Sequence, residues 1–207
     1  MTRPYRMNKR AEELDATRGR ILKATMAVHD EKGVAPATYA DIAERAGVGV
    51  ATVYRHFPRV GDLVSACGIH VWQEMRPPKP DTAAGVFVGL ATLPARVTRL
   101  VAELDAFYDR GELRLRLASR DRELIPELDG FLSAVESGVE ALVREALGRD
   151  VPEETVKVTV ALLSFPTWQA FSRSGLSAEK IRAARAALVL AHLDAAPAKA
   201  RRKTGAA

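Results

Sequence analysis

The chain has 207 residues, of which 47% are hydrophobic and 28% charged, and its formal net charge is +5. This composition is that of an ordinary globular protein with a hydrophobic core. Its single cysteine, Cys67, excludes an intramolecular disulfide and every zinc site that needs several cysteines. No window contains the roughly 18–20 apolar residues that span a bilayer, and no apolar stretch follows the basic N-terminal residues. We therefore expect no membrane segment, no signal peptide and a cytoplasmic location.

Apolar residues recur at helical spacing along almost the whole chain, and strand patterns are nearly absent, which predicts an all-α fold. Residues 1–16 form a basic N-terminal arm, and a first helix follows over 17–32, where Gly33 ends it. A second basic segment, expected to be disordered, covers 197–207. Each end is interpreted either as a solubilising segment or as an arm that contacts a phosphate backbone. The second interpretation is favoured for the N-terminal arm, because it adjoins the motif that comes next.

Two short helices follow, joined by a tight turn. Thr38 can cap the first of them, with Asp41 as its capping-box partner. Gly47 ends this helix, because a tight turn between helices commonly needs a left-handed residue. Gly49 is a weak cap for the second helix, which ends before Pro58. The segment is typical of a helix-turn-helix.

The rest of the chain is predicted to be helical as well. Residues 59–75 form a longer helix, and the proline-rich stretch 76–80 ends it. The remaining helices are expected at 94–110, 112–119, 126–147, 150–174 with a kink at Pro166, and 177–195.

The second short helix has small and hydrogen-bonding side chains where an exposed helix normally has Lys and Glu. A helix that enters the DNA major groove with its N-terminal residues against base edges needs such side chains. Val50 and Ala51 can pack against thymine methyl groups, and Thr52 can bond a base or a phosphate. The side chains suited to phosphate oxygens are those of Tyr54, Arg55 and His56.

The motif residues closely resemble the TetR (tetracycline repressor-like) family of transcriptional regulators. The resemblance rests on Thr38-Tyr39-Ala40-Asp41-Ile42-Ala43, on Gly47-Val48, on Thr52-Val53-Tyr54-Arg55-His56-Phe57-Pro58, and on a matching first helix before them. It covers about residues 17–72. It implies an all-helical homodimer, in which each subunit joins an N-terminal three-helix DNA-binding domain to a larger helical domain for ligand binding and dimerisation.

The resemblance also implies roles for single residues. Tyr54 and His56 would hold phosphates, and Tyr39 and Ala40 would lie near DNA. The family often has a lysine where this chain has Val60, and Arg59 could supply that contact instead. The expected DNA-binding residues are Thr38, Tyr39, Ala40, Val50, Ala51, Thr52, Tyr54, Arg55, His56 and Arg59.

His29 stands where the family usually has an aromatic residue late in its first helix. We favour a hydrogen-bonded core histidine there. The alternative is a pH switch, in which DNA affinity changes between roughly pH 6 and 7.5.

The second half of the chain offers candidates for two further sites. Ordinary core packing explains most of its aromatic residues, but a pocket for an unidentified small-molecule effector could be lined by Trp72, Phe107, Tyr108, Phe131, Phe165 and Trp168. The last helices have small and apolar residues at helical spacing, which predicts a dimer interface suited to a palindromic operator on double-stranded DNA. Its expected residues are Val160, Leu163, Thr167, Ile181, Ala184, Leu188 and Ala191.

We predict a DNA-binding transcriptional regulator and favour a repressor that a small molecule releases from its operator. Two alternatives remain open: an architectural or weakly specific DNA-binding protein without an effector, and a helical protein-interaction module that has lost DNA binding. An enzyme is disfavoured, because the four histidines have no metal-ligand spacing and no nucleophile or phosphate-loop motif occurs. We expect no cofactor and no metal. The expected domains are 17–58 for DNA binding and 59–196 for effector binding and dimerisation, with 59–75 as the linking helix.

Overall fold

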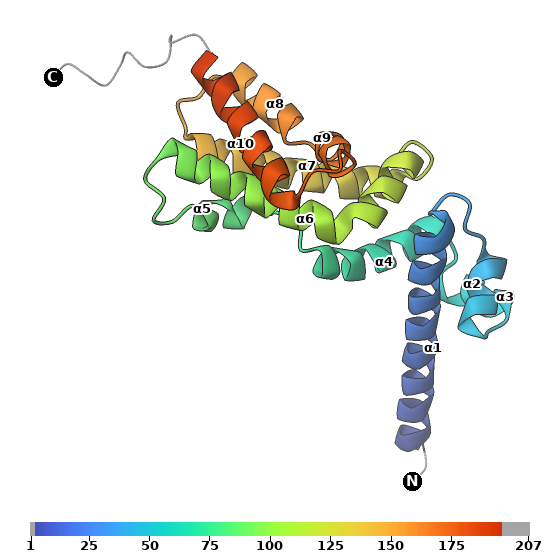
Figure 1. Cartoon of the computed structure of the whole chain (residues 1–207). Helices are drawn as coiled ribbons and strands as arrows, with labels where there is room; N and C mark the ends of the chain where they lie inside the picture. Colours follow the sequence, from blue (N-terminus) through green and yellow to red (C-terminus); the bar gives the residue numbers. More distant parts are fainter. Residues whose placement is uncertain (1–2, 196–207) are drawn as a thin grey trace. The chain divides into compact units, whose positions relative to one another are not determined.

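The computed structural model describes residues 3–195, with side chains from residue 11 onward. Figure 1 shows this part of the chain as helices and connecting loops, in order from blue to red, and it contains no strand. None of the described helices is long and apolar enough to cross a membrane. The helices are α1 Arg3–Lys32, α2 Tyr39–Ala46, α3 Val50–His56, α4 Val60–Met75, a 3-10 turn Pro80–Thr82, α5 Ala83–Val86, α6 Leu93–Asp121, α7 Pro126–Leu147, α8 Glu153–Leu162, α9 Phe165–Ser172 and α10 Ala178–Ala195.

Several boundaries differ from those expected. Helix α1 begins at Arg3, so the backbone of the predicted basic arm continues directly into the first helix. Helix α6 is continuous across the position where two helices were expected. Gly111 is buried inside α6, and the packing around it outweighs the roughly 1 kcal/mol that a glycine costs a helix interior. The basic tail expected at 197–207 lies outside the described residues.

The chain divides into two compact units. The first unit comprises the chain up to Glu74 together with Leu113–Leu132. The second comprises Met75–Glu112 together with the chain from Ser133 onward. The first unit therefore contains α1–α3, all of α4 except Met75, and parts of α6 and α7.

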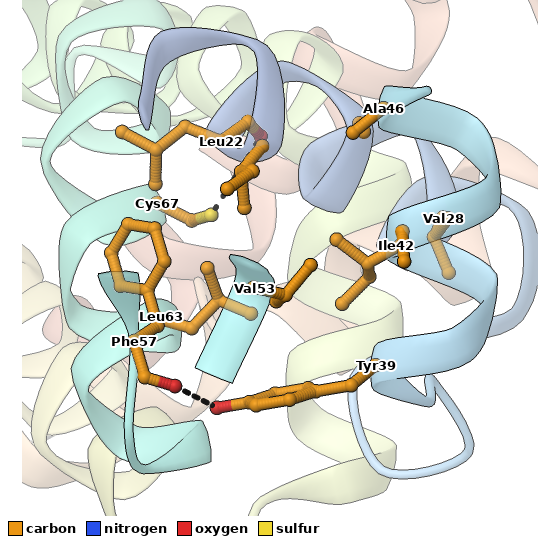
Figure 2. Packing of buried hydrophobic residues seen from close by; sticks show 12 residues of the cluster. Leu22, Val28, Tyr39, Ile42, Ala46, Val53, Phe57, Leu63 and Cys67 are labelled. Atoms are coloured by element: carbon orange, nitrogen blue, oxygen red, sulfur yellow. Dashed lines mark hydrogen bonds between the residues drawn. The ribbon is translucent and has the colours of Figure 1, made fainter. Parts of the chain in front are cut away.

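The core of the first unit forms where α1, α2, α3 and α4 meet (Figure 2). Each helix contributes the apolar side chains of one face, as the sequence spacing predicted. The Cys67 thiol lies inside this cluster, with its Sγ 4.0 Å from the carbonyl oxygen of Leu22. The principal buried residues are Ile21, Leu22, Val28, Ile42, Ala43, Val53, Phe57, Leu63 and Cys67.

The second unit contains a buried ion pair between α6 and α10. The Arg185 guanidinium contacts the Asp105 carboxylate, and the Arg185 side chain is only 1% exposed. Arg185 also donates to the carbonyl oxygen of Leu163 at 3.3 Å, and the Tyr108 hydroxyl donates to the same oxygen at 3.0 Å. Arg185 thus joins Asp105 to the end of α8, where the Tyr108 hydroxyl binds the same carbonyl oxygen.

The kink expected at Pro166 is a break between two helices. Pro166 has no N–H, and its ring is incompatible with a helical carbonyl four residues earlier. Helix α8 therefore ends at Leu162, and α9 begins at Phe165. The carbonyl oxygen of Leu163 becomes available at this break, and Tyr108 and Arg185 bind it.

Candidate nucleic-acid interface

The turn between α2 and α3 has the predicted caps. The Thr38 hydroxyl accepts a hydrogen bond from the Asp41 N–H at 3.2 Å, and the Asp41 carboxylate accepts one from the Thr38 N–H at 2.9 Å. Gly47 has φ 63° and ψ 42°, the left-handed conformation that a side chain disfavours. Gly49 precedes α3 without a side-chain cap. The local signals in the sequence thus set the geometry of the turn.

Helix α3 has one buried side chain, and most of its other side chains are exposed. Of its seven residues only Val53 is buried. A short helix whose exposed face has small and hydrogen-bonding side chains instead of Lys and Glu is suited to lie against DNA. The exposed side chains are those of Val50, Ala51, Tyr54 and Arg55, and the partly buried ones are those of Thr52 and His56.

Two arginines near this surface differ in their partners. Arg55 is exposed, and no carboxylate among the described residues pairs with it. Arg59 donates to Asp62 at 2.7 and 3.1 Å, and this bond lowers the pKa of the Asp62 carboxyl. The Arg59 side chain is still 81% exposed, so its remaining N–H groups are accessible. Both arginines can donate to an anion, and Arg55 can do so without giving up an ion pair.

The start of α2 reaches α3 through an aromatic contact. Tyr39 is only 8% exposed, and its hydroxyl donates to the carbonyl oxygen of Phe57 at 2.7 Å (Figure 2). The rings of Tyr39 and Tyr54 lie with their centroids 4.5 Å apart. Ala40, the next residue, is exposed. The residues expected near DNA on α2 and α3 are therefore neighbours, but the Tyr39 hydroxyl already has a partner.

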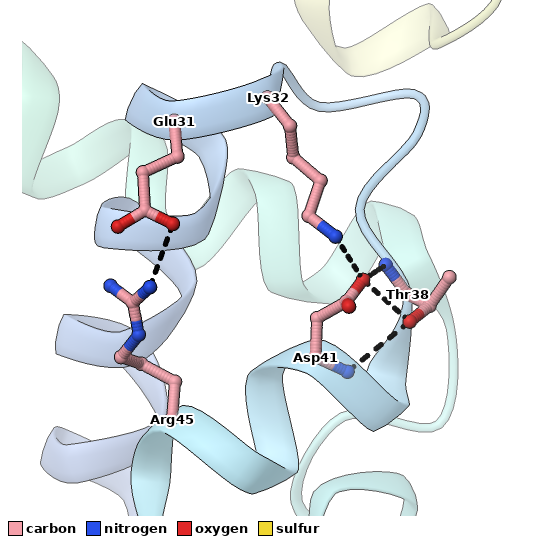
Figure 3. Close-up of polar contacts among 5 residues, drawn as sticks. All are labelled: Glu31, Lys32, Thr38, Asp41 and Arg45. Atoms are coloured by element: carbon pink, nitrogen blue, oxygen red, sulfur yellow. Dashed lines mark hydrogen bonds and ion pairs between the residues drawn. The ribbon is translucent and has the colours of Figure 1, made fainter.

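Two ion pairs hold α2 against the end of α1 (Figure 3). The Lys32 ammonium lies 2.7 Å from the Asp41 carboxylate, and the Arg45 guanidinium lies 2.7 Å from the Glu31 carboxylate. The hydrogen bond from Lys32, followed by those from Thr38, holds the pKa of the Asp41 carboxyl well below its usual range. Pairs this exposed contribute little free energy. Their effect is to favour one orientation of α2 on α1.

The end of α6 supplies acceptors to the loop between α1 and α2. The Asp121 carboxylate accepts hydrogen bonds from the N–H groups of Val34 and Ala35 at 2.8 and 3.0 Å. Arg120 donates to the Lys32 carbonyl oxygen at 2.9 Å and also to Asp121, and this second bond is the main reason that the pKa of Asp121 is lowered. Neither contact was predicted from the sequence, because contacts across 87 and 88 positions leave no local pattern.

His29 is a partly buried residue near the end of α1. Burial lowers its pKa to about 4, although Asp30 and Asp121 act in the opposite direction. The imidazole therefore stays neutral between pH 6 and 7.5. This favours the core histidine over the pH switch among the two interpretations of the sequence.

The six aromatic residues expected to line an effector pocket fall into separate groups. Trp72 and Phe131 meet edge to face in the first unit, with ring centroids 5.5 Å apart. The other four belong to the second unit, where they pack with ring centroids 5.2–5.8 Å apart: Phe107, Tyr108, Phe165 and Trp168.

A pocket of about 410 Å³ lies elsewhere in the second unit. None of the six aromatic residues lines it. It opens between the 3-10 turn, α5, the end of α7 and the start of α8, and its lining includes Ala83, Ala141, Arg144, Arg149 and Val156.

The residues expected at a dimer interface differ in exposure. Leu163 and Ile181 are buried within the second unit. Val160, Thr167 and Ala184 are partly buried. Leu188 is 45% exposed, and Ala191 is exposed one turn further along α10.

The family model "Bacterial regulatory proteins, tetR family" matches residues 21–67, which span the end of α1 to the first half of α4. An uncharacterised HTH-type transcriptional regulator of Mycobacterium tuberculosis is 31% identical over 153 residues, which cover 72% of this chain and 78% of that protein.

Solved structures show the same fold. The multidrug-binding protein EbrR, complexed with imidazole, superposes with a TM-score of 0.58 at 19% identity, over 84% of this chain and 88% of that one. The TetR-like regulator LfrR of Mycobacterium smegmatis, complexed with proflavine, has a TM-score of 0.50 at 25% identity, over 88% and 97% of the two chains. The family model and the mycobacterial relative, together with the helix-turn-helix geometry, show that the chain belongs to the TetR family of DNA-binding transcriptional regulators, which are not enzymes.

Proposed function

We propose that the protein is a cytoplasmic repressor that binds a palindromic operator as a homodimer and leaves it when a small molecule binds. The observation that carries the DNA-binding part is helix α3, in which only Val53 is buried and which presents small, hydroxyl and cationic groups outward. The relatives EbrR and LfrR, whose structures contain imidazole and proflavine, support the small-molecule part.

The proposed contacts with DNA follow from exposure and chemistry. Val50, Ala51 and Thr52 at the start of α3 face base edges, where methyl groups and a hydroxyl can discriminate between base pairs. Tyr54 and Arg55 donate to phosphates, which position the helix without reading sequence. The further proposed phosphate contacts are those of Arg59, His56 and the exposed start of α2 at Thr38 and Ala40.

The Nε2 atom of His56 is not directly accessible to a phosphate. It is covered by protein and has no hydrogen-bond partner among the described residues. A phosphate contact through this atom therefore needs a rotation of the side chain when DNA binds.

The proposed dimer uses α8 and α10. Leu188 and Ala191 offer an exposed apolar strip on α10, and Val158 on α8 is 37% exposed. A two-fold dimer matches the symmetry of a palindromic operator. The proposed effector favours a conformation of the dimer in which the two α3 helices no longer fit successive major grooves.

The proposal is tested by fluorescence anisotropy on the intergenic DNA beside the protein's own gene and on scrambled DNA, across a salt series. A regulator should prefer its operator by about 10³-fold or more. Equal affinity for both DNAs would instead support the architectural alternative, and no binding to either would support the protein-interaction module.

Arg55→Ala is the variant that tests the α3 surface. It should weaken binding to both DNAs and lower the salt slope by about one. Arg116→Ala is the matched control, because Arg116 is also exposed and has no ion pair among the described residues but lies on α6. If both variants lose affinity equally, the loss reflects overall charge and α3 is not the contact surface.

A further inference from the structure

We infer that Tyr39 is a positioning residue for DNA recognition: it holds the ring of Tyr54 and the C-terminal end of α3 and does not itself bind DNA. This inference rests on the proposed DNA-binding function of α3. It changes the role that the family resemblance implied for Tyr39, from a residue near DNA to one that acts through its neighbour.

The first observation is the hydrogen bond at the end of α3. The Tyr39 hydroxyl donates to the carbonyl oxygen of Phe57 at 2.7 Å, and Phe57 is the residue that directly follows α3. The last carbonyl groups of a helix have no partner within the helix, so an external donor is needed. Burial raises the pKa of the Tyr39 phenol, with a further contribution from Tyr54, so the hydroxyl keeps the proton that it donates.

The second observation is the contact between the two tyrosine rings. Tyr54 is 55% exposed, and its ring lies 4.5 Å from the Tyr39 ring at an angle of 57°. A tilted arrangement at this distance is a favourable one for aromatic pairs. An exposed tyrosine without such a neighbour would exchange freely between rotamers. The contact therefore restricts the direction in which the Tyr54 hydroxyl is presented.

The third observation is that α3 has few other attachments. It has seven residues, a length at which an isolated helix is unstable in water, and only Val53 within it is buried. At its end Phe57 is buried, and the Arg18 guanidinium of α1 lies 4.6 Å from the Phe57 ring centroid. Tyr39 supplies the corresponding contact from α2. The orientation of α3 thus depends on Val53 and on this end, where α1 and α2 both contact Phe57.

The test measures operator affinity for Tyr39→Phe and Tyr39→Leu, each alone and combined with Tyr54→Phe. Tyr39→Phe keeps the ring and removes only the hydrogen bond to Phe57. We expect it to weaken operator binding by about 5-fold, the factor that corresponds to one ordinary hydrogen bond. Tyr39→Leu also removes the ring contact with Tyr54, so it should bind the operator more weakly than Tyr39→Phe. Because the ring contact acts through the Tyr54 hydroxyl, this additional loss should disappear when Tyr54→Phe is present as well. An additional loss of the same size in the Tyr54→Phe background would show that Tyr39 does not act through Tyr54 and would overturn the inference.

Tyr108→Phe is the matched control, because it also removes a buried hydroxyl that donates to a backbone carbonyl, but in the second unit. It should leave operator affinity unchanged. If Tyr39→Phe behaves like Tyr108→Phe, the inference is wrong.

A second measurement does not depend on DNA. In protein labelled with ¹³C in its tyrosine rings, the NMR signals of Tyr54 should show the ring-current shift of the Tyr39 contact, and Tyr39→Leu should abolish it. Protection of the buried Cys67 thiol from a thiol reagent reports that the variant is folded. A Tyr54 shift without any sequence-selective DNA binding would refute the proposed function and leave the contact intact. Tyr54 signals unchanged in Tyr39→Leu would refute the contact itself.

Discussion

The Asp121 carboxylate, at the last residue of α6, accepts a 2.8 Å hydrogen bond from the backbone N–H of Val34, in the loop between α1 and α2. The first unit therefore includes the end of a helix that begins in the second unit. A loop N–H that is removed from water needs such an acceptor, because a buried donor without a partner costs free energy.

Asp121→Asn should destabilise the protein by about 1–3 kcal/mol, because it replaces a charged acceptor of two backbone N–H groups by an amide that also donates. The measurement is the free energy of unfolding in urea at neutral pH. Asp109→Asn, at an exposed position of the same helix, is the control and should change stability by less than about 0.5 kcal/mol. Equal effects at the two positions would mean that the Asp121 contacts contribute nothing.

Gly33→Ala and Gly19→Ala should have opposite effects on stability. Gly33 has φ +99°, and a Cβ added there would overlap the Arg120 guanidinium, so alanine should destabilise by more than about 1 kcal/mol. Gly19 lies within α1, and no atom lies near the position of an added Cβ, so alanine should stabilise by about 0.5–1 kcal/mol. Thermal unfolding of both variants checks the sign of each change. A stabilising Gly33→Ala would contradict the described loop conformation.

The stability of the protein should depend on pH through His29. Burial lowers its folded pKa to about 4, while the unfolded chain takes up a proton near the ordinary value of 6.5. Between pH 6.5 and 4 the unfolded state therefore binds more protons at His29 than the folded state does. The contribution of the neutral imidazole to the free energy of unfolding is therefore complete above pH 6.5 and is lost as the pH falls toward 4. Between pH 7 and 5 the loss from this group should be about 2 kcal/mol.

Urea unfolding of wild type and His29→Phe at pH 7 and pH 5 measures this difference. The carboxyl groups with lowered pKa values, such as Asp41 and Asp121, are common to both proteins and titrate mainly at lower pH. The variant should lose less stability than wild type over this range. Parallel losses in the two proteins would rule out His29 as the source.

Removing one partner of the buried Arg185–Asp105 pair should cost about 3–5 kcal/mol, because it leaves an uncompensated charge in the core. Burial lowers the pKa of the Arg185 guanidinium to about 10, because removal from water disfavours its charged form. Arg185→Leu combined with Asp105→Leu should recover much of the stability that Arg185→Leu alone loses. A double-mutant cycle of urea unfolding measures the coupling, and additive losses would show that the two groups do not interact.

Local signals in the sequence were sufficient for the helix-turn-helix. Thr38 and Asp41 form the predicted capping box, and Gly47 has the predicted left-handed conformation, because these features involve residues a few positions apart. The all-helical fold followed from the spacing of the apolar residues, and the family followed from the resemblance of the motif residues to TetR regulators. The caps, the turn and the helices each depend on residues only a few positions apart, so a short stretch of the sequence is enough to predict them.

Only the tertiary structure decided how distant residues are used. The sequence could not show that Asp121 bonds the loop after α1, that Tyr39 is buried against Phe57 and Tyr54, or that the Leu163 carbonyl freed near Pro166 is bound by Tyr108 and Arg185. Nor could it show that the aromatic residues expected in one pocket belong to two different units. Whether a polar or aromatic side chain faces a ligand or a protein partner depends on which segments pack together, and that is set by the burial of apolar surface across the whole chain.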